Sequence, residues 1–305
     1  MTYNVRYFGQ GFRGAGSSQR SIRRICDVIS GLDQLPDVIC FQEIEQRSLR
    51  SFFSHDKRYP QETQFSGLQR ILDETLQRQG KAIRYQGLYY PAHAYRVGKM
   101  PLFTMGLGIL ISPKFHIEAH NASAPHDVTF RRIAALAKLK QSRVCAYVRI
   151  RSPDNVSFEF FNSHLSLPAF ATRQFWQNFP AVGYGENQQR EVSQLAQFIN
   201  QTAQSDRFFI LGDFNAAPST PSYRLLLAGT GTEDPFCNHL GLSETELMTR
   251  WPTAGFMNLK MRLDHILIGP GIRCDDLQGS HPFTELGLWS GLSDHVPLLG
   301  RFRTK

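Results

Sequence analysis

A chain of 305 residues with 41% hydrophobic and 20% charged residues is long and apolar enough to bury a large core, which excludes an intrinsically disordered protein. Its formal net charge is +8, from 34 Lys and Arg against 26 Asp and Glu, and such a surface favours polyanionic partners such as nucleic acid or anionic lipid. No apolar run approaches a membrane span and no secretory signal is visible, so we expect a cytoplasmic protein, or a secreted or periplasmic one if the start is trimmed.

The predicted elements alternate along the first part of the chain. A strand over residues 1–8 and a Gly-rich loop precede a helix over 18–32, whose apolar residues recur at helical spacing. A Pro-Asp turn opens a strand over 36–45, and a second amphipathic helix covers 66–80. Strands and helices therefore share this region.

Strands dominate the rest of the chain, with one further helix over 187–202. The predicted strands cover residues 105–112, 133–140, 144–150, 158–165, 207–215, 261–269 and 296–302. Many strands, few helices and no repeat period predict an α/β (α+β) fold in which sheets pack on each other with helices outside. We expect one domain over 1–305, with loop insertions at about 45–66 and 168–186.

Polar residues follow several of these apolar strands directly. Burying so many carboxylates requires a cation or dense hydrogen bonding, and the ends of neighbouring strands converge on one pocket. The residues are Asn4, Glu43, His164, Asp213, Asn215, Asp264, His265, Asp294 and His295, of which His265 is expected to have a structural role.

The donor types indicate a hard divalent cation. Carboxylate and amide oxygens suit Mg²⁺ or Mn²⁺, whereas zinc is disfavoured because the chain has no H-E-x-x-H and its five cysteines are scattered without a C-x-x-C pair. The chemistry that fits these groups is hydrolysis of a phosphate ester, in which the cation neutralises charge on oxygen and an imidazole handles a proton.

Six motifs in order then resemble those of the endonuclease/exonuclease/phosphatase superfamily, which includes deoxyribonuclease I. The motifs are "TYNV", "ICFQEIE", "NSHLS", "LGDFNAAP", "RLDHIL" and "LSDHVPL", and the resemblance spans residues 2–302. The resemblance implies a four-layer sandwich of two mostly antiparallel sheets flanked by helices.

The resemblance also implies roles for the metal and water groups. Glu43 resembles the main metal ligand, with Asn4 and Asp294 near the same ion or its waters. Asp213 and Asn215 resemble the residues that position the attacking water and contact the phosphate, and Asn4 is a further candidate for substrate contact.

The remaining carried-over roles concern the histidines and an arginine. Asp264 resembles the carboxylate that orients His295, the general base or phosphate clamp. His164 resembles the second histidine of some branches, a general acid or phosphate ligand, and Arg132 resembles an arginine that faces the phosphate. Arg6 and "NSHL" depart from the apurinic endonuclease pattern, which favours the branches with two histidines.

The first functional hypothesis is a Mg²⁺- or Mn²⁺-dependent nuclease that cleaves DNA or RNA by in-line attack of water. It is favoured by the net charge, by aromatic residues that can stack on bases and by arginines near the expected site, namely Arg6, Arg13, Arg131 and Arg132. No obligate protein partner is indicated.

The alternative is a phospholipid phosphodiesterase or a phosphoinositide phosphatase. It is favoured by "NSHLSLP" and by the aromatic segment within 168–186, which suits a membrane interface. An inactive scaffold is disfavoured because Glu43, Asp213 and His295 are all present.

Overall fold

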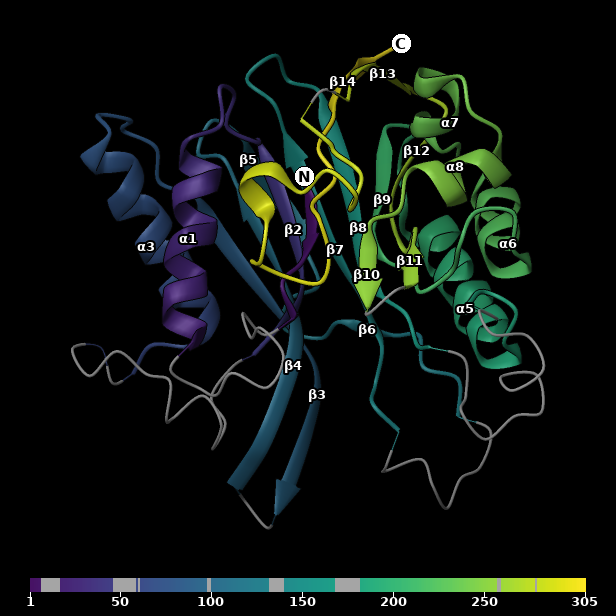
Figure 1. Ribbon diagram of the computed structural model, residues 1–305, viewed down its shortest axis with the longest axis horizontal. Coiled ribbons are helices and arrows are strands. Elements are labelled where there is room, and N and C mark those ends of the chain that lie inside the picture. Colours follow the sequence, from purple (N-terminus) through teal and green to yellow (C-terminus); the bar gives the residue numbers. More distant parts are fainter. Residues whose placement is uncertain are drawn as a thin grey trace.

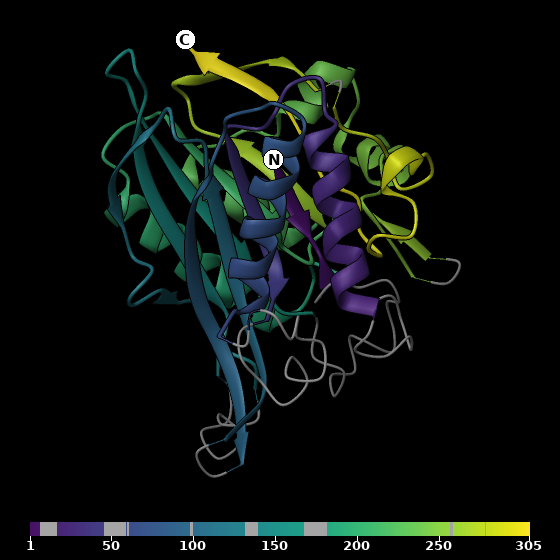
Figure 2. The same ribbon diagram turned by 90° about the vertical axis from the view of Figure 1, so that its left-hand side faces the viewer.

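The architecture is that of two β-sheets packed face to face between helices (Figures 1 and 2). The structure is a computed structural model, and it describes residues 1–6, 17–45, 59, 61–97, 100–131, 140–167, 182–256, 259–277 and 279–305. Among the described residues, no helix combines the length and the apolar character needed to cross a membrane.

The first sheet contains four strands in the order β1-β2-β4-β3. The β1–β2 pair is parallel, and the β2–β4 and β3–β4 pairs are antiparallel. Figure 1 shows β3 and β4 extending together beyond the other strands. The bounds of the four strands are β1 (Thr2–Asn4), β2 (Val38–Ile44), β3 (Gln86–Val97) and β4 (Met100–Ile111).

The second sheet follows the order β12-β9-β8-β7-β5, and a short strand, β6, also pairs with β7. Its β8–β9 pair is parallel, and its other pairs are antiparallel. The strands are β5 (His116–His120), β6 (His126–Asp127), β7 (Val144–Arg151), β8 (Ser157–His164), β9 (Phe208–Asp213) and β12 (Asp264–Ile268).

Helices cover the two outer faces. Helices α1 (Ser17–Ser30) and α3 (Gln64–Arg78) lie on the first sheet, and α5 (Glu186–Thr202) and α6 (Pro221–Thr230) lie on the second (Figure 1). The other elements are α7 (Pro235–Leu240), α8 (Glu244–Arg250), the 3-10 helix η3 (Gly287–Trp289), and the strand pairs β10 (Ala254–Phe256) with β11 (Leu259–Met261) and β13 (Ile272–Asp276) with β14 (Arg301–Thr304).

Alternation along each strand divides the core into three apolar layers. In β2, Ile39 and Phe41 pack toward α1 and α3, whereas Val38 and Cys40 face the second sheet. A strand covered on both faces needs apolar residues at nearly every position, which explains why "VICF" does not alternate with polar residues. The predicted fold class, two mostly antiparallel sheets flanked by helices, is therefore confirmed.

Some predicted elements differ from the structure. The strand predicted over 296–302 is reduced to β14, because Leu298 forms only an isolated bridge with Thr2 before the chain turns away. Strand β3 was not predicted, and neither were α6, α7 and α8. The strand predicted over 133–140 lies outside the described residues except for residue 140, as do 46–58, 60 and 168–181 of the two predicted insertions.

Candidate active site

Three neighbouring strands of the second sheet each carry a polar residue at the same end. His164 is the last residue of β8, Asp213 is the last residue of β9 and Asp264 is the first residue of β12. Strand register pairs His164 of β8 with Asp213 of β9, and Asp213 with Asp264 of β12. In β9, Phe209 and Leu211 face the first sheet, and Asp213 follows them at the same two-residue spacing. The three side chains therefore line the space between the sheets.

Gly212 permits the close approach of β8 and β9 just before Asp213. Its φ is 140°, a conformation that other residues rarely adopt, and a Cβ at this position would lie 1.9 Å from the backbone oxygen of Ser163. The strand pair must therefore separate to accept any side chain at position 212.

We expect Gly212→Ala to destabilise the fold by about 2–4 kcal/mol, because both backbone strain and a backbone clash result. Gly231 offers a matched control: its φ is 64°, yet a Cβ there meets nothing within 4 Å. Gly231→Ala should cost about 1 kcal/mol. Thermal unfolding of both variants measures the difference, and equal melting temperatures would contradict this account of the strand pairing.

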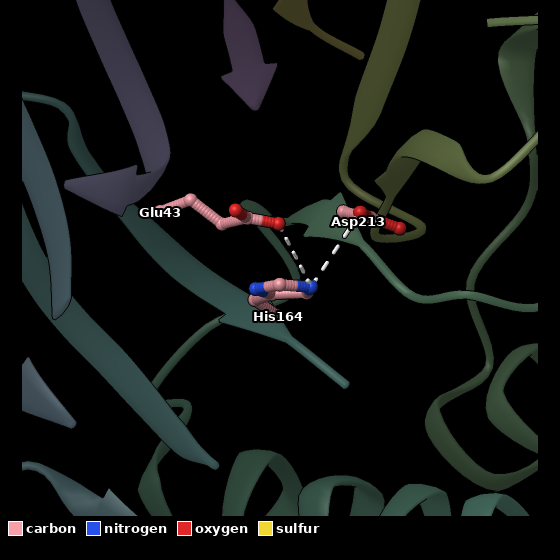
Figure 3. Close-up of side chains that lie close together, drawn as sticks. All are labelled: Glu43, His164 and Asp213. Carbon is pink, nitrogen blue, oxygen red and sulfur yellow. Dashed lines mark ion pairs between the residues drawn. The ribbon is translucent and has the colours of Figure 1, made fainter. Parts of the chain in front are cut away.

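The first sheet contributes Asn4 and Glu43 from the opposite side of the same space. Asn4 ends β1 two residues after Thr2, whose hydroxyl accepts from Gln42 between the sheets. Glu43 has a φ of 56°, and the β2–β4 register shifts between Phe41 and Ile44. This bulge turns the Glu43 carboxylate toward the second sheet (Figure 3).

The amide of Asn4 joins the two carboxylates. Its Nδ2 donates to Glu43 Oε1 at 3.1 Å and to Asp213 Oδ2 at 2.9 Å, while its Oδ1 accepts from the backbone nitrogen of Arg6 at 3.0 Å. Asp294 lies at the margin of this group, where it forms an ion pair with the Arg6 guanidinium. The predicted contacts of Asn4 and Asp294 with a metal ion remain predictions.

His295 and Asp264 form a hydrogen-bonded pair next to Asp213. The distance from His295 Nδ1 to Asp264 Oδ2 is 2.8 Å, and His295 Nε2 lies 3.8 Å from Asp213 Oδ2. The backbone nitrogen of Asp264 donates to Thr253 Oγ1, which fixes the backbone at the start of β12. Burial alone lowers the pKa of His295, but the Asp264 and Asp213 carboxylates outweigh it and raise this pKa to about 10.

His164, on the neighbouring strand β8, lies close to Asp213 and Glu43 (Figure 3). Its Nε2 is 3.6 Å from Asp213 Oδ2 and 3.8 Å from Glu43 Oε1, and Asn215 Nδ2 is 3.3 Å from the same nitrogen. Burial, with the positive charge of Arg143 second, holds the pKa of His164 well below its usual range. His164 and His295 thus have opposite charge preferences, although both flank the same carboxylate.

Asn215 is held close to this group by its own backbone. Its φ is 47°, its backbone nitrogen donates to Asp213 Oδ1 at 3.0 Å, and its Nδ2 donates to the Leu165 oxygen at 2.9 Å. The predicted residues Asn4, Glu43, His164, Asp213, Asn215, Asp264 and His295 are therefore in one cluster, with Asp294 at its margin, whereas Arg132 lies outside the described residues.

The cluster fits a hard divalent cation. One ligand atom each from Glu43, His164 and Asp213 lie within 4.8 Å of one another, and Asp213, Asp264 and His295 form a second such group. Burial raises the pKa of Glu43, and burial raises the pKa of Asp213 to about 7. Ionisation of these two neighbouring carboxylates is therefore costly in the absence of a cation. A bound cation would lower the energy of their charged forms.

Cation binding should therefore depend on pH. The folded-state pKa of Asp213, about 7, exceeds its unfolded value of 3.8, so the ionised carboxylate destabilises the cation-free fold increasingly as pH rises from about 4 to 7. A cation binds the ionised form, so protons compete with it below pH 7, by about tenfold in affinity per pH unit for each proton displaced.

The measurement is the rise in melting temperature that Mg²⁺ produces at pH 8 and at pH 5.5, each relative to the protein in EDTA at that pH. At each pH, other titrating groups affect the protein with Mg²⁺ and the protein in EDTA alike, so the rise in melting temperature reports cation binding. We expect the larger rise at pH 8. An equal or larger rise at pH 5.5 would contradict the placement of the cation at Asp213.

Three residues that support the site were not found in the sequence. The Ser293 hydroxyl donates to the backbone oxygen of Asn4 at 2.8 Å and accepts from the backbone nitrogen of His295 at 3.2 Å. Its position directly before Asp294 could have identified it from the sequence. Thr253 and Arg143 lie in segments without a motif, so only the three-dimensional structure reveals them.

Comparisons with known proteins agree with the fold. A family model described as "Endonuclease/Exonuclease/phosphatase family" matches residues 1–295. A search of curated proteins finds no match.

Three solved structures illustrate the structural likeness. A protein of this family from Leptotrichia buccalis C-1013-b is 16% identical, with a TM-score of 0.63 over 99% of this chain and 98% of that one. The mannosyl-6-phosphatase Bt3783 of Bacteroides thetaiotaomicron VPI-5482 is 14% identical, with 0.57 over 99% and 98%. ANGEL2, a 2',3'-cyclic phosphatase in complex with adenosine-2',3'-vanadate, is 18% identical, with 0.55 over 92% and 85%. At these identities the shared property is the fold.

Proposed function

This chain belongs to the endonuclease/exonuclease/phosphatase family of hydrolytic phosphoesterases, and from that premise we propose that it is a divalent-metal-dependent phosphodiesterase that cleaves nucleic acid. The observation that carries the proposal is the cluster itself. Asn4 joins Glu43 to Asp213, and the Asp264–His295 pair lies against the same Asp213 carboxylate. A cation site and a proton-handling pair therefore share one residue.

The cation, Mg²⁺ or Mn²⁺, would be held by Glu43 and Asp213, with Asn4 and Asp294 nearby. When bound, it would supply Lewis-acid stabilisation of the negative charge on the phosphoryl oxygens. The Asn4 amide fixes the separation of the two carboxylates through hydrogen bonds of 3.1 and 2.9 Å, so they are already in place before a cation binds. Such preorganisation reduces the cost of assembling the site.

The other residues of the cluster have separate roles toward the substrate phosphate. Asp264 fixes the imidazole of His295 through Nδ1, which leaves Nε2 directed at Asp213 and at the substrate side. We assign to His295 Nε2 the transfer of a proton during in-line attack by water. His164 and Asn215 would hydrogen-bond the phosphoryl oxygens from the opposite side of Asp213.

Charge favours nucleic acid as the substrate class. The chain carries a net charge of +8, and the partly exposed Arg6 guanidinium is fixed by Asp294 at the margin of the cluster. A polyanion gains from such a surface through counterion release, whereas a small phosphoester gains little. The Arg132 contact with phosphate stays a prediction, as does assignment to the branches with two histidines.

A phospholipid or phosphoinositide substrate is the second candidate. Leu167 and Tyr184, which flank the segment 168–181, have exposed fractions of 46% and 48%. Exposed apolar side chains of this size suit insertion into a membrane interface. Small phosphoesters form a third class, because two structural neighbours are a mannosyl-6-phosphatase and a 2',3'-cyclic phosphatase.

A substrate panel separates these classes. Single-stranded DNA, RNA, sphingomyelin liposomes, phosphoinositides and mannose 6-phosphate are each incubated with the protein and Mg²⁺ or Mn²⁺. We expect turnover of a nucleic acid that disappears in EDTA and falls as salt is raised. If a lipid is turned over and both nucleic acids stay intact, the proposed substrate class is wrong. The proposed chemistry of the site would still hold.

A further inference from the structure

We propose that Arg143 is a positioning residue of this site: its guanidinium fixes His164 in the tautomer that carries the hydrogen on Nε2. The consequence for catalysis rests on the proposed function, whereas the tautomer itself does not. Arg143 is outside every motif of the sequence, and its role follows from contacts that the fold creates.

The backbone of Arg143 is held firmly just before β7. Its nitrogen donates to Thr129 Oγ1 at 2.7 Å, and its oxygen accepts from the Val128 nitrogen at 2.9 Å. The residue is only 9% exposed, and within the described part of the chain no carboxylate lies at ion-pair distance from the guanidinium. A buried cation that has no ion-pair partner among the described residues is costly, so the retention of Arg143 beside the carboxylate cluster calls for an explanation.

The guanidinium is directed at His164. Its Nη1 lies 3.2 Å from His164 Nδ1, while Nε and Nη2 donate at 3.4 Å to Ser166 Oγ and Gln141 Oε1, respectively. A guanidinium has donors and no acceptor. His164 Nδ1 must therefore present its lone pair to Arg143, and in a neutral imidazole the hydrogen then resides on Nε2.

The surroundings of Nε2 contain one opposing group. Asn215 Nδ2 lies 3.3 Å from His164 Nε2 and would favour a lone pair there. The Asn215 amide nitrogen carries two hydrogens, and one of them donates at 2.9 Å to the Leu165 oxygen, so Asn215 keeps that bond when His164 Nε2 carries a hydrogen. A charge-assisted hydrogen bond from Arg143 is about twice as strong as one from a neutral amide, so Arg143 determines the tautomer.

The hydrogen on His164 Nε2 faces the carboxylates of the site. Two carboxylate oxygens lie near His164 Nε2, Asp213 Oδ2 at 3.6 Å and Glu43 Oε1 at 3.8 Å, and both belong to the cluster proposed to bind the phosphate. A donor at this position attracts a phosphoryl oxygen, whereas a lone pair repels it. Arg143 thereby acts on the reaction through His164 and without touching the substrate.

The test combines a spectroscopic and a kinetic measurement on two variants. Arg143→Met removes every donor and keeps most of the side-chain volume, and Arg143→Lys keeps a cationic donor. Proteins labelled with ¹⁵N-histidine are examined by long-range ¹H–¹⁵N correlation NMR, and His164→Gln identifies the His164 signals by their loss. Arg149→Met, in the adjoining strand β7 and paired with Glu118, is the matched control for loss of one arginine.

We expect hydrogen on Nε2 in the wild-type, Arg143→Lys and Arg149→Met proteins, and on Nδ1 in Arg143→Met. In parallel, Arg143→Met should lower kcat by about 10–100-fold with a smaller change in KM, and Arg143→Lys should restore most of it.

Hydrogen on Nδ1 in the wild-type protein would overturn the inference, as would an unchanged tautomer in Arg143→Met. If circular dichroism shows that Arg143→Met does not fold, the wild-type spectrum still decides the question. Absence of phosphoesterase activity in the wild-type protein would refute the proposed function and leave the NMR result to judge Arg143 separately.

Discussion

Replacement of His295 by alanine is expected to lower kcat by about 10³–10⁴-fold, at the upper end of the range for loss of a positioned proton-transfer group. His295 is the imidazole whose Nδ1 is held by Asp264 and whose Nε2 faces Asp213. KM should change less, because the groups assigned to the phosphate on the His164 side are untouched. The measurement is a full kinetic profile on the best substrate of the panel.

The companion variant Asp264→Asn keeps the shape of the pair and removes its charge. The Asp264 and Asp213 carboxylates raise the pKa of His295 to about 10, so the loss of one of them should move its NMR titration to lower pH. His116→Ala serves as the control, since His116 is exposed at the far end of β5. Activity of His295→Ala equal to that of the control would refute the role of the pair.

Replacement of Glu43 by glutamine should abolish metal-dependent activity and preserve the fold. We expect kcat/KM to fall by at least about 10³-fold, because a cation contributes several kcal/mol of charge stabilisation. The glutamine oxygen can still accept from Asn4, which donates to Glu43 Oε1 at 3.1 Å. The variant therefore removes a charge and a ligand without removing the hydrogen bond.

The stability of this variant is a second readout. Burial raises the pKa of Glu43, so the ionised carboxylate is destabilising in the absence of a cation. In EDTA, Glu43→Gln should melt at or above the temperature of the wild-type protein, whereas the rise produced by Mg²⁺ should disappear. A wild-type response to Mg²⁺ in this variant would place the cation elsewhere.

The strands and their polar ends could be predicted because they depend on local sequence. In β9, four apolar residues precede Gly212 and Asp213, and both faces of that strand are covered. Helix α6 was not predicted, although its first residue is Pro221, and proline is favoured at that position because its missing N–H needs no partner.

Contacts between distant segments could not be predicted, because they depend on register and bulges. The inward direction of Glu43 follows from a positive φ and a shift in the β2–β4 pairing, and neither can be recognised in "VICFQEI". His265 was expected to have a structural role, and its side chain is directed away from the cluster. It directly follows Asp264, yet it lies on the helix-facing side of β12, with its Nε2 at 2.9 Å from the Ala216 oxygen.

The most direct test of the central claim is the cleavage of a labelled single-stranded oligonucleotide by wild-type and Glu43→Gln proteins prepared in parallel, each with Mg²⁺ and with EDTA. We predict cleavage only by the wild-type protein with Mg²⁺. Equal cleavage by Glu43→Gln, or cleavage that persists in EDTA, would contradict a cation-dependent phosphodiesterase site built on Glu43 and Asp213.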